Sequence, residues 1–269
     1  MTDTPLDVVR MLRAAGCVFA EEEADLLAEA APDRDVLDAL VARRVAGLPL
    51  EHLLGRVEFG GLRLAVSPGV FVPRRRTEAV VHEAAALVRV RGAAPVVVDL
   101  CSGVGAIAAA LAEDLRRGGG PEPVELHATE IDPVAVRCAR RNLEPYGGTV
   151  HTGDLDGPLP SGLRGRVDML VANVPYVPTG AIGTMPPEAR DHEPRRALDG
   201  GPDGLDIARR FVAAGPLWLA PGGALLVETG ERQAPVLAKA VAEQGLEPRI
   251  VVDDDLEATV VIGTAPPAP

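Results

Sequence analysis

From residue 95 onward, short strand-like runs alternate with longer segments that have helical spacing. The strand-like runs are 95–100 (PVVVDL), 124–130 (VELHATE), 167–173 (VDMLVAN) and 222–229 (GGALLVET). Apolar strands separated by helices are typical of parallel sheets that are buried on both faces. We therefore predict an α/β fold with a doubly wound sheet covered by helices on both sides. Two more strands are expected near 248–252 and 258–262.

The residues before this alternating region have a different pattern. Apolar positions at helical spacing predict two or three short helices within 6–46, which form a helical N-terminal domain over 1–50. A hairpin is expected at 56–66, turning on Gly60-Gly61 within a connector over 51–75.

A helix over 78–89 then opens the sheet domain, 76–263, with Thr77 as its N-cap. Residues 264–269 (TAPPAP) are expected to be a disordered tail.

Composition limits the possible partners. The chain has 269 residues, 47% of them hydrophobic, and its net charge is -12. An acidic surface repels phosphate backbones, so tight binding to nucleic acid would need a local basic patch, for which Arg74-Arg75-Arg76 is the best candidate. We expect no direct tight nucleic-acid binding.

The cysteines and the hydropathy indicate the compartment. Cys17, Cys101 and Cys138 lie far apart and form no CxxC pair, which argues against a metal site and a disulfide framework. The N-terminal residues do not resemble a signal peptide, and no apolar run reaches membrane-spanning length. A cytoplasmic protein without a membrane partner is expected.

A glycine turn follows the first strand of the alternating region. The run Asp99-Leu100-Cys101-Ser102-Gly103-Val104-Gly105 joins this strand to the next helix. Glycines permit a tight turn and a close approach of the backbone to a ligand, at the strand ends where open α/β sheets bind ligands. The same glycine spacing also matches the sequence fingerprint of dinucleotide-binding proteins.

Acidic residues at successive strand ends decide between the two cofactor classes. Asp99 precedes the turn, and Glu130 ends the second strand. Asp154 lies in HTGDL (151–155), after a third strand that precedes the run at 167–173. A pyrophosphate beside these carboxylates would meet like charge, whereas S-adenosylmethionine carries an ammonium, a sulfonium and a ribose diol. The acids therefore favour S-adenosylmethionine over NAD, and the absence of a GxxxxGK[ST] motif excludes a P-loop.

The stretch VANVPYVP (171–178) predicts the acceptor site. It places Asn173 at the same sheet edge as the glycine turn. The Asn173 oxygen and the Val174 carbonyl can each accept an N–H from a planar NH2 group, because Pro175 contributes no competing donor. Tyr176 can stack on a planar group or close the pocket wall. Cys101 is interpreted as a small residue tolerated in the turn and not as a nucleophile.

Several of these segments resemble one family. DLCSGVGAIAAALA, ATEIDPVAVRCARRN and NVPYVP resemble class I S-adenosylmethionine-dependent methyltransferases with the signature Asn-Pro-Pro-Tyr. The segment LVARRVAGLPLEHLLGRVEFGGLRLAVSPGVFVPRRRTE is similar to the domain junction of the HemK/PrmC protein-(glutamine-N5) methyltransferases. EARDHEPRRALDGGPDGLDIARR resembles the loop and helix that follow the signature. The similarity runs from about residue 40 to 263.

The resemblance implies a seven-stranded methyltransferase sheet whose last strand is antiparallel, a hairpin connector and an N-terminal domain that binds substrate. It implies methylation of a glutamine side-chain amide, in the GGQ loop of a peptide chain release factor. Arg74 and Glu78 would line the cofactor cleft. The residues expected to bind the cofactor are Phe71, Thr77, Asp99, Cys101, Ser102, Gly103, Gly105, Glu130, Asp154, Leu155 and Asn173. Those expected to bind the substrate are Asn173, Val174, Pro175 and Tyr176, of which Asn173, Pro175 and Tyr176 are the catalytic candidates.

Three departures from the family pattern leave alternatives open. Val174 replaces a proline, Arg75 and Arg76 replace a proline and an acid, and the N-terminal helical segment is short. The alternatives are a paralogue acting on a ribosomal protein, an amino-methyltransferase for adenine or another base, and a homologue that binds cofactor without turnover.

Overall fold

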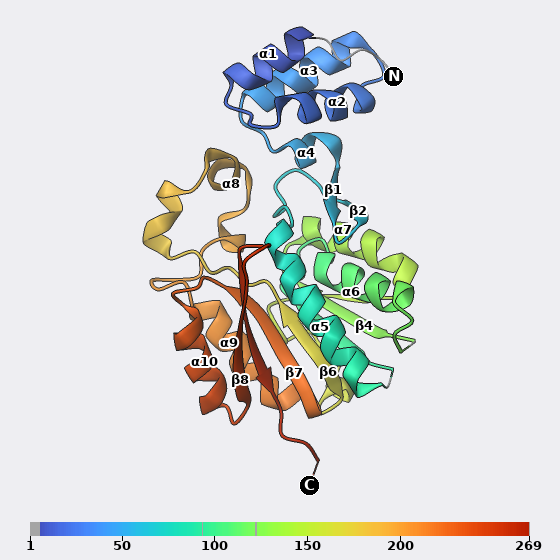
Figure 1. Cartoon of the computed structure of the whole chain (residues 1–269), viewed down its shortest axis with the longest axis vertical. Helices are drawn as coiled ribbons and strands as arrows, with labels where there is room; N and C mark the ends of the chain where they lie inside the picture. Colours follow the sequence, from blue (N-terminus) through green and yellow to red (C-terminus); the bar gives the residue numbers. More distant parts are fainter. Residues whose placement is uncertain (1–5, 93, 122, 269) are drawn as a thin grey trace.

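The N-terminal helices form a small unit with its own core. The computed structural model describes residues 6–92, 94–121 and 123–268. The helices are α1 (Leu6–Ala14), α2 (Ala20–Ala30) and α3 (Arg34–Val45), which lie together at the top of Figure 1. Val8, Leu12 and Leu27 are buried between them. The predicted helices within 6–46 are therefore present.

A short helix and a hairpin connect this unit to the sheet. They are α4 (Leu50–Leu54), β1 (Arg56–Phe59) and β2 (Leu62–Ala65). Phe59 pairs with Leu62, and both turn residues have positive φ, 57° at Gly60 and 71° at Gly61. This conformation favours glycine and confirms the predicted hairpin. A Cβ on Gly60 would lie 2.7 Å from the Ala110 Cβ, so the turn packs directly on the domain below.

The main sheet has seven strands in the order β5-β4-β3-β6-β7-β9-β8. Its strands are β3 (Val96–Leu100), β4 (Glu125–Glu130), β5 (Thr149–Thr152), β6 (Val167–Ala172), β7 (Leu219–Thr229), β8 (Glu247–Asp253) and β9 (Ala258–Thr264). Strands β3 to β7 pair in parallel, and β9 is antiparallel to both β7 and β8. The predicted sheet with an antiparallel last strand is confirmed.

Helices cover both faces of the sheet, as Figure 1 shows. The covering helices are α5 (Glu78–Arg91), α6 (Ala106–Arg117), α7 (Pro133–Leu143), α9 (Asp206–Trp218) and α10 (Ala234–Glu243). Along β3, Val97 belongs to the core under α5, α6 and α7, whereas Val98 and Leu100 belong to the core under α9 and α10. Because alternate side chains point to opposite faces and both faces are covered, every residue of this strand is buried, Asp99 included.

The strand order creates a crevice beside β3. The chain passes from β3 through β4 to β5 on one side and from β6 to β7 on the other, although β3 and β6 are neighbours. Ligands of doubly wound sheets bind where the order reverses, beyond the carboxyl ends of the strands. The glycine turn after β3 and Asn173 after β6 therefore face the same crevice.

The structure corrects two expectations. Thr77 is not the N-cap of α5: its backbone is helical and its side chain makes no cap hydrogen bond. Its hydroxyl donates to Glu228 instead. The tail prediction is wrong at its beginning, because Thr264 ends β9, the Ala265 N–H donates to Gly223 and the Pro266 carbonyl accepts from Gly222; residue 269 lies outside the described residues.

The remaining elements are short, and the hydrophobic patterns in the sequence did not predict them. They are α8 (Pro187–His192) and the 3₁₀ turns Arg75–Thr77, Glu144–Tyr146, Ser161–Leu163, Thr179–Thr184 and Arg195–Ala197. Within the described ranges, no helix is both long and apolar enough to cross a bilayer.

Candidate active site

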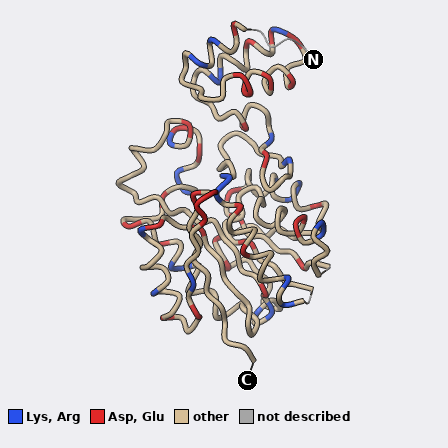
Figure 2. Tube along the Cα trace, viewed as in Figure 1, with Lys and Arg blue, Asp and Glu red and all other residues tan. Residues whose placement is uncertain are grey.

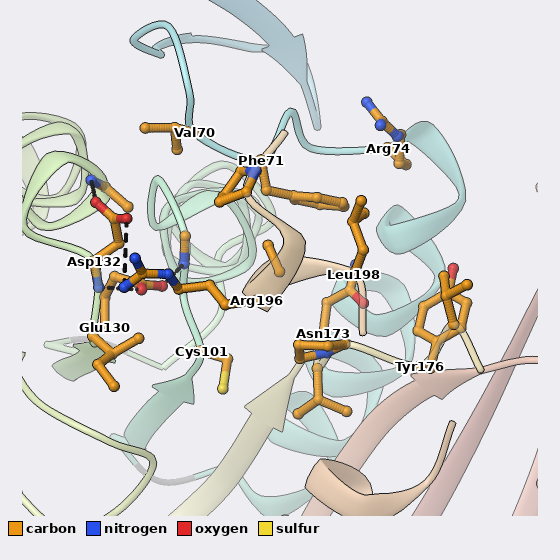
Figure 3. A pocket seen from close by; sticks show the side chains of 18 of the residues that line it. Val70, Phe71, Arg74, Cys101, Glu130, Asp132, Asn173, Tyr176, Arg196 and Leu198 are labelled. Carbon is orange, nitrogen blue, oxygen red and sulfur yellow. Dashed lines mark hydrogen bonds and ion pairs between the residues drawn. The ribbon is translucent and has the colours of Figure 1, made fainter. Parts of the chain in front are cut away.

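A pocket opens at the carboxyl ends of β3, β4 and β6, with about 850 Å³ of free space when the solvent at its mouth is included. Figure 3 shows Glu130 and Cys101 on one side of it and Asn173 and Tyr176 on the other. The residues that line it are Val70, Phe71, Arg74, Arg76, Cys101, Gly103, Glu130, Ile131, Asp132, Ala135, Asn173, Val174, Pro175, Tyr176, Val177, Met185, Pro194, Arg196, Ala197 and Leu198. Both predicted halves of the site, the glycine turn and the NVPY stretch, therefore meet in one pocket.

Two glycines shape the turn after β3 in different ways. Gly103 has φ 56°, and a Cβ placed on it would meet nothing within 4 Å, so its backbone is open toward the pocket. Gly105 has φ 78°, and its Cβ would lie 3.1 Å from Leu143 of α7. The first glycine thus allows a ligand to approach the backbone, and the second allows α6 and α7 to pack closely.

Glu130 is held in place by the backbone around it. Its Oε2 accepts from the Gly103 N–H at 2.8 Å and its Oε1 from the Asp132 N–H at 2.7 Å. Burial raises the pKa of Glu130, an effect that these N–H groups oppose. A carboxylate has about four lone-pair positions, so two remain for donors in the pocket, such as a vicinal diol.

The other two predicted acids do not line the pocket. The Asp99 side chain is fully buried, and its Oδ2 accepts from the Ala108 N–H at 3.2 Å. Burial raises the pKa of Asp99 to about 8, so this group is mostly neutral at pH 7. Asp154 forms an exposed ion pair with Arg210 at 2.7 Å. The expectation that three carboxylates line the cleft is thus met by Glu130 alone.

Asp132 is an acid of the pocket that the sequence reasoning missed. It caps α7 by accepting from the Val134 N–H at 2.7 Å, and its Oδ2 lies 3.9 Å from Nη1 of Arg196, another residue of the pocket lining. An Asp immediately before Pro133 is a recognisable helix start, so the signal was present.

Cys101 lines the pocket but is not activated. Burial, together with the nearby Glu130, raises the pKa of the Cys101 thiol to about 12. The thiol stays protonated at neutral pH and is a poor nucleophile. Among the described residues, no group of three or more His, Cys, Asp or Glu side chains could hold a metal ion.

On the acceptor side, a hydrogen-bond network holds Asn173. Its Nδ2 donates to Thr77 Oγ1 at 3.0 Å, and Thr77 Oγ1 donates to Glu228 Oε2 at 2.5 Å. The Tyr176 hydroxyl and the Arg76 Nε donate to Glu228 Oε1 at 2.9 and 3.0 Å. Thr77 thus reaches the site through Asn173, although it does not itself line the pocket.

Glu228 is the second residue that the sequence reasoning missed. It lies near the end of β7 in the run ALLVET and is 2% exposed. An acid that closes an apolar strand was the signal used for Glu130, and the same signal marks Glu228.

The backbone of the NVPY stretch is fixed from behind by the segment 198–204. The Val177 N–H donates to the Leu198 carbonyl at 3.0 Å, and the Gly200 N–H donates to the Val177 carbonyl at 2.9 Å. A Cβ on Gly200 would lie 2.6 Å from the Pro175 oxygen. The Val174 side chain is buried in the core beneath α9, which explains how valine substitutes for the family's rigid proline.

The remaining predicted residues lie around the pocket. Phe71 lines it, with the Arg74 guanidinium 5.0 Å from its ring centroid. Ser102, Gly105 and Leu155 are not among its lining residues, and Leu155 is buried in the core. The Glu78 carboxylate points to the hairpin, where it accepts from the Gly60 N–H at 3.1 Å, so the expectation that it lines the cleft is wrong.

The basic triplet does not form a free basic patch. Arg74 pairs with the buried Glu193 at 2.6 Å, and Arg76 pairs with Glu228. Figure 2 shows basic and acidic residues interspersed along the whole chain. Two of the three arginines of the triplet are therefore engaged in ion pairs with buried carboxylates of this chain.

Comparison with known proteins identifies the family. Release factor glutamine methyltransferase from Streptomyces coelicolor is 43% identical over 207 residues, which cover 75% of this chain and 71% of that protein. The enzyme of the same name from Mycolicibacterium smegmatis is 38% identical and covers 87% and 86% of the two chains. The chain belongs to the release factor glutamine methyltransferase family. No family model matches the sequence.

One relative within the same range of similarity has another name. The 4-amino-L-phenylalanine/4-methylamino-L-phenylalanine methyltransferase of Streptomyces pristinaespiralis is 37% identical and covers 86% of this chain and 78% of that protein. This chain is therefore also similar to a methyltransferase whose name gives a free amino acid as its substrate.

Solved structures support the fold. A methyltransferase from Pyrococcus furiosus has a TM-score of 0.53 at 17% identity and covers 77% of this chain and 90% of its own. The 16S rRNA N2 G1207 methyltransferase of T. thermophilus, solved with AdoMet and guanosine, has a TM-score of 0.52 at 21% identity and covers 78% and 49%. At these identities the likeness shows the methyltransferase fold alone.

Proposed function

We propose that this protein transfers the methyl group of S-adenosylmethionine to the side-chain amide nitrogen of a glutamine in a peptide chain release factor. One observation carries the proposal: Asn173, with its Nδ2 committed to Thr77, shares a pocket with the backbone-pinned Glu130 carboxylate. The first group can orient a planar NH2, and the second can hold a nucleoside diol.

The residues present fit the cofactor. Glu130 keeps accepting capacity for a ribose diol, and the open backbone at Gly103 allows a ligand to approach closely. Three arginines line the pocket: Arg74 and Arg76 are paired with buried carboxylates, and Arg196 lies 3.9 Å from Asp132. Because a carboxylate offsets each of these cations, the pocket suits a cationic ligand better than a diphosphate. We assign Phe71, Cys101, Gly103 and Glu130 to the cofactor, with the Asp154-Leu155 turn beyond them. When bound, S-adenosylmethionine supplies an electrophilic methyl on its sulfonium.

Asn173 and Val174 would hold the acceptor. The Asn173 Oδ1 and the Val174 carbonyl would each take one N–H of the glutamine amide and turn its nitrogen toward the cofactor side of the pocket. An amide nitrogen is a weak nucleophile, so orientation and exclusion of water supply most of the acceleration.

Tyr176 closes the pocket wall and is not the base. Its hydroxyl proton is committed to Glu228, and burial raises the pKa of Tyr176. The amide proton can leave to water after the methyl is transferred, so no general base is required before attack.

The direct test is transfer to defined proteins. The enzyme is incubated with methyl-labelled S-adenosylmethionine and purified release factors, and the label is located by peptide mass spectrometry. Label on the glutamine of the GGQ loop is expected. Label found only on lysine, arginine or nucleic acid, or on a ribosomal protein in preference to release factors, would contradict the proposal.

A free aromatic amine is the second candidate acceptor. The Streptomyces pristinaespiralis relative covers more of this chain than the Streptomyces coelicolor relative does. An arylamine is also a planar NH2 with a delocalised lone pair, and Phe71, Leu198 and Tyr176 provide apolar walls. The same assay with 4-amino-L-phenylalanine in place of the release factor separates the two: methylation of this amine with a higher kcat/KM would favour the second candidate.

A further inference from the structure

Three donors converge on the buried carboxylate of Glu228. Oε1 accepts from Tyr176 and Arg76, and Oε2 accepts from Thr77. Burial raises the pKa of Tyr176, so its phenol remains a donor at neutral pH, and a guanidinium can only donate. Each of these three neighbours therefore donates a hydrogen bond to this carboxylate.

This arrangement sets the polarity of the next two hydrogen bonds. The single hydroxyl proton of Thr77 points to Glu228, so the Thr77 oxygen accepts from its other neighbour, Asn173. An asparagine amide has nearly the same shape in both orientations, and only its partners decide which end faces where. Here Nδ2 faces Thr77, and Oδ1 is left for the acceptor.

Building on the proposed function, we propose that Glu228 is a positioning residue that acts through Thr77 to keep the oxygen of Asn173, and not its NH2, turned toward the methyl acceptor. This relay of hydrogen bonds, from Glu228 through Thr77 to Asn173, then determines specificity as well as rate. A glutamine amide or an amine presents N–H groups to this oxygen, whereas a glutamate or an ester presents only oxygen lone pairs, which it repels.

Glu228→Gln tests the relay because glutamine keeps the shape of glutamate but reverses the direction of the hydrogen bond between residue 228 and Thr77. Arg76 and Tyr176 both donate at the Oε1 position, so the new amide keeps its oxygen there and places its NH2 opposite Thr77. Thr77 must then accept from residue 228 and donate to Asn173, which turns the Asn173 NH2 toward the acceptor. We expect kcat to fall by at least about thirtyfold, comparable to losing a positioned polar group.

Thr77→Val supplies the decisive comparison. Without the hydroxyl, Asn173 is free to take both orientations, so kcat should fall only about fivefold, by the fraction of molecules that present Oδ1. In the double variant E228Q/T77V the reversal cannot be transmitted. Its kcat should therefore be higher than that of E228Q alone and close to that of T77V. Thr77→Ser keeps the hydroxyl and should keep at least about a third of wild-type kcat.

Two controls separate positioning from loss of stability or of cofactor. Glu113→Gln removes another buried, ion-paired carboxylate, on α6 outside the pocket. It should leave kcat unchanged. Calorimetry with S-adenosylhomocysteine should give dissociation constants within about twofold of wild type for every variant. A double variant slower than E228Q, or an E228Q with wild-type kcat, would overturn the proposal.

A readout that does not depend on turnover keeps the relay testable if the proposed function fails. With ¹⁵N-labelled asparagine and Asn173→Ala for assignment, one carboxamide proton of Asn173 should be shifted by its bond to Thr77, and the shift should vanish in T77V. If this shift is present but no methyl transfer is detected, the proposed function is refuted and the relay is not. An unchanged Asn173 signal in T77V would refute the relay.

Discussion

Arg44 of α3 donates to Glu188 of α8 at 2.5 Å, although 144 residues separate them in the sequence. Arg44 also donates to Glu23 at 2.6 Å and to the Leu48 carbonyl at 3.2 Å, and it is buried. The segment around α8 contributes Met185, Pro194 and Leu198 to the pocket. The N-terminal helices therefore brace one wall of the site.

Removing this guanidinium should cost more than removing its exposed partner. Arg44→Met leaves the nearly buried Glu23 carboxylate without its cation, and we expect the free energy of unfolding to fall by about 3 kcal/mol. Glu188 is 48% exposed, so Glu188→Gln should cost at most about 1 kcal/mol. Urea denaturation of the two variants measures both. Equal losses in the free energy of unfolding would mean that the burial of Arg44 does not increase its contribution to stability.

Asn173→Ala should remove acceptor positioning without removing the cofactor. The change deletes the oxygen that orients the acceptor, so we expect kcat to fall about a hundredfold or more. The affinity for S-adenosylhomocysteine, measured by calorimetry, should change by less than about threefold. A variant that keeps wild-type turnover would show that Asn173 does not orient the acceptor.

Glu130→Gln should weaken cofactor binding, which Asn173→Ala leaves nearly unchanged. The amide cannot accept from both Gly103 and Asp132, and it loses the charge that strengthens a bond to a diol. Losing charged hydrogen bonds of this kind corresponds to a dissociation constant for S-adenosylhomocysteine about 10- to 100-fold higher. Glu125→Gln, at the other end of the same strand, is the matched control and should bind as wild type does. Equal affinities for the two variants would exclude Glu130 from the cofactor site.

The buried Asp99 should make stability depend on pH. Its pKa is raised by burial from 3.8 to about 8, so between these values the folded state keeps a proton that the unfolded state loses. The stability contribution is therefore full below about pH 4 and declines as the pH rises to about 8.

Asp99→Asn provides the comparison, because the amide mimics the protonated carboxyl. The free energy of unfolding of wild type, relative to this variant, should fall with pH between about 4 and 8, by about 1.4 kcal/mol per pH unit at the steepest. Denaturant titrations at several pH values measure it. A difference that is independent of pH would mean that Asp99 is ionised in the folded protein.

Local patterns were enough to predict the main helices and the carboxyl ends of the strands that carry the site. The hairpin at Gly60-Gly61, the helix that begins at Pro133 and the strand that ends at Glu130 follow from turn residues, caps and apolar runs. Parallel strands bring their carboxyl ends to one edge, so the meeting of Gly103 with Asn173 could also be predicted.

Direction and protonation of side chains could not be predicted in this way. In the sequence, Asp99 and Glu130 are both acidic residues near the end of a strand. In the structure, Asp99 points into the helix layer and is mostly neutral, whereas Glu130 faces the pocket. Thr77 has the sequence position of a helix cap, but its hydroxyl donates a hydrogen bond to the Glu228 carboxylate, 151 residues later.

The sequence by itself determined the α/β architecture, the edge at which the site lies and the family signature, because these depend on patterns over neighbouring residues. Only the tertiary structure decided that Glu228, Thr77 and Asn173 form one chain of hydrogen bonds and that Arg44 reaches Glu188. Such contacts join segments more than 90 residues apart, and they exist only after the sheet and its connections have brought those segments together.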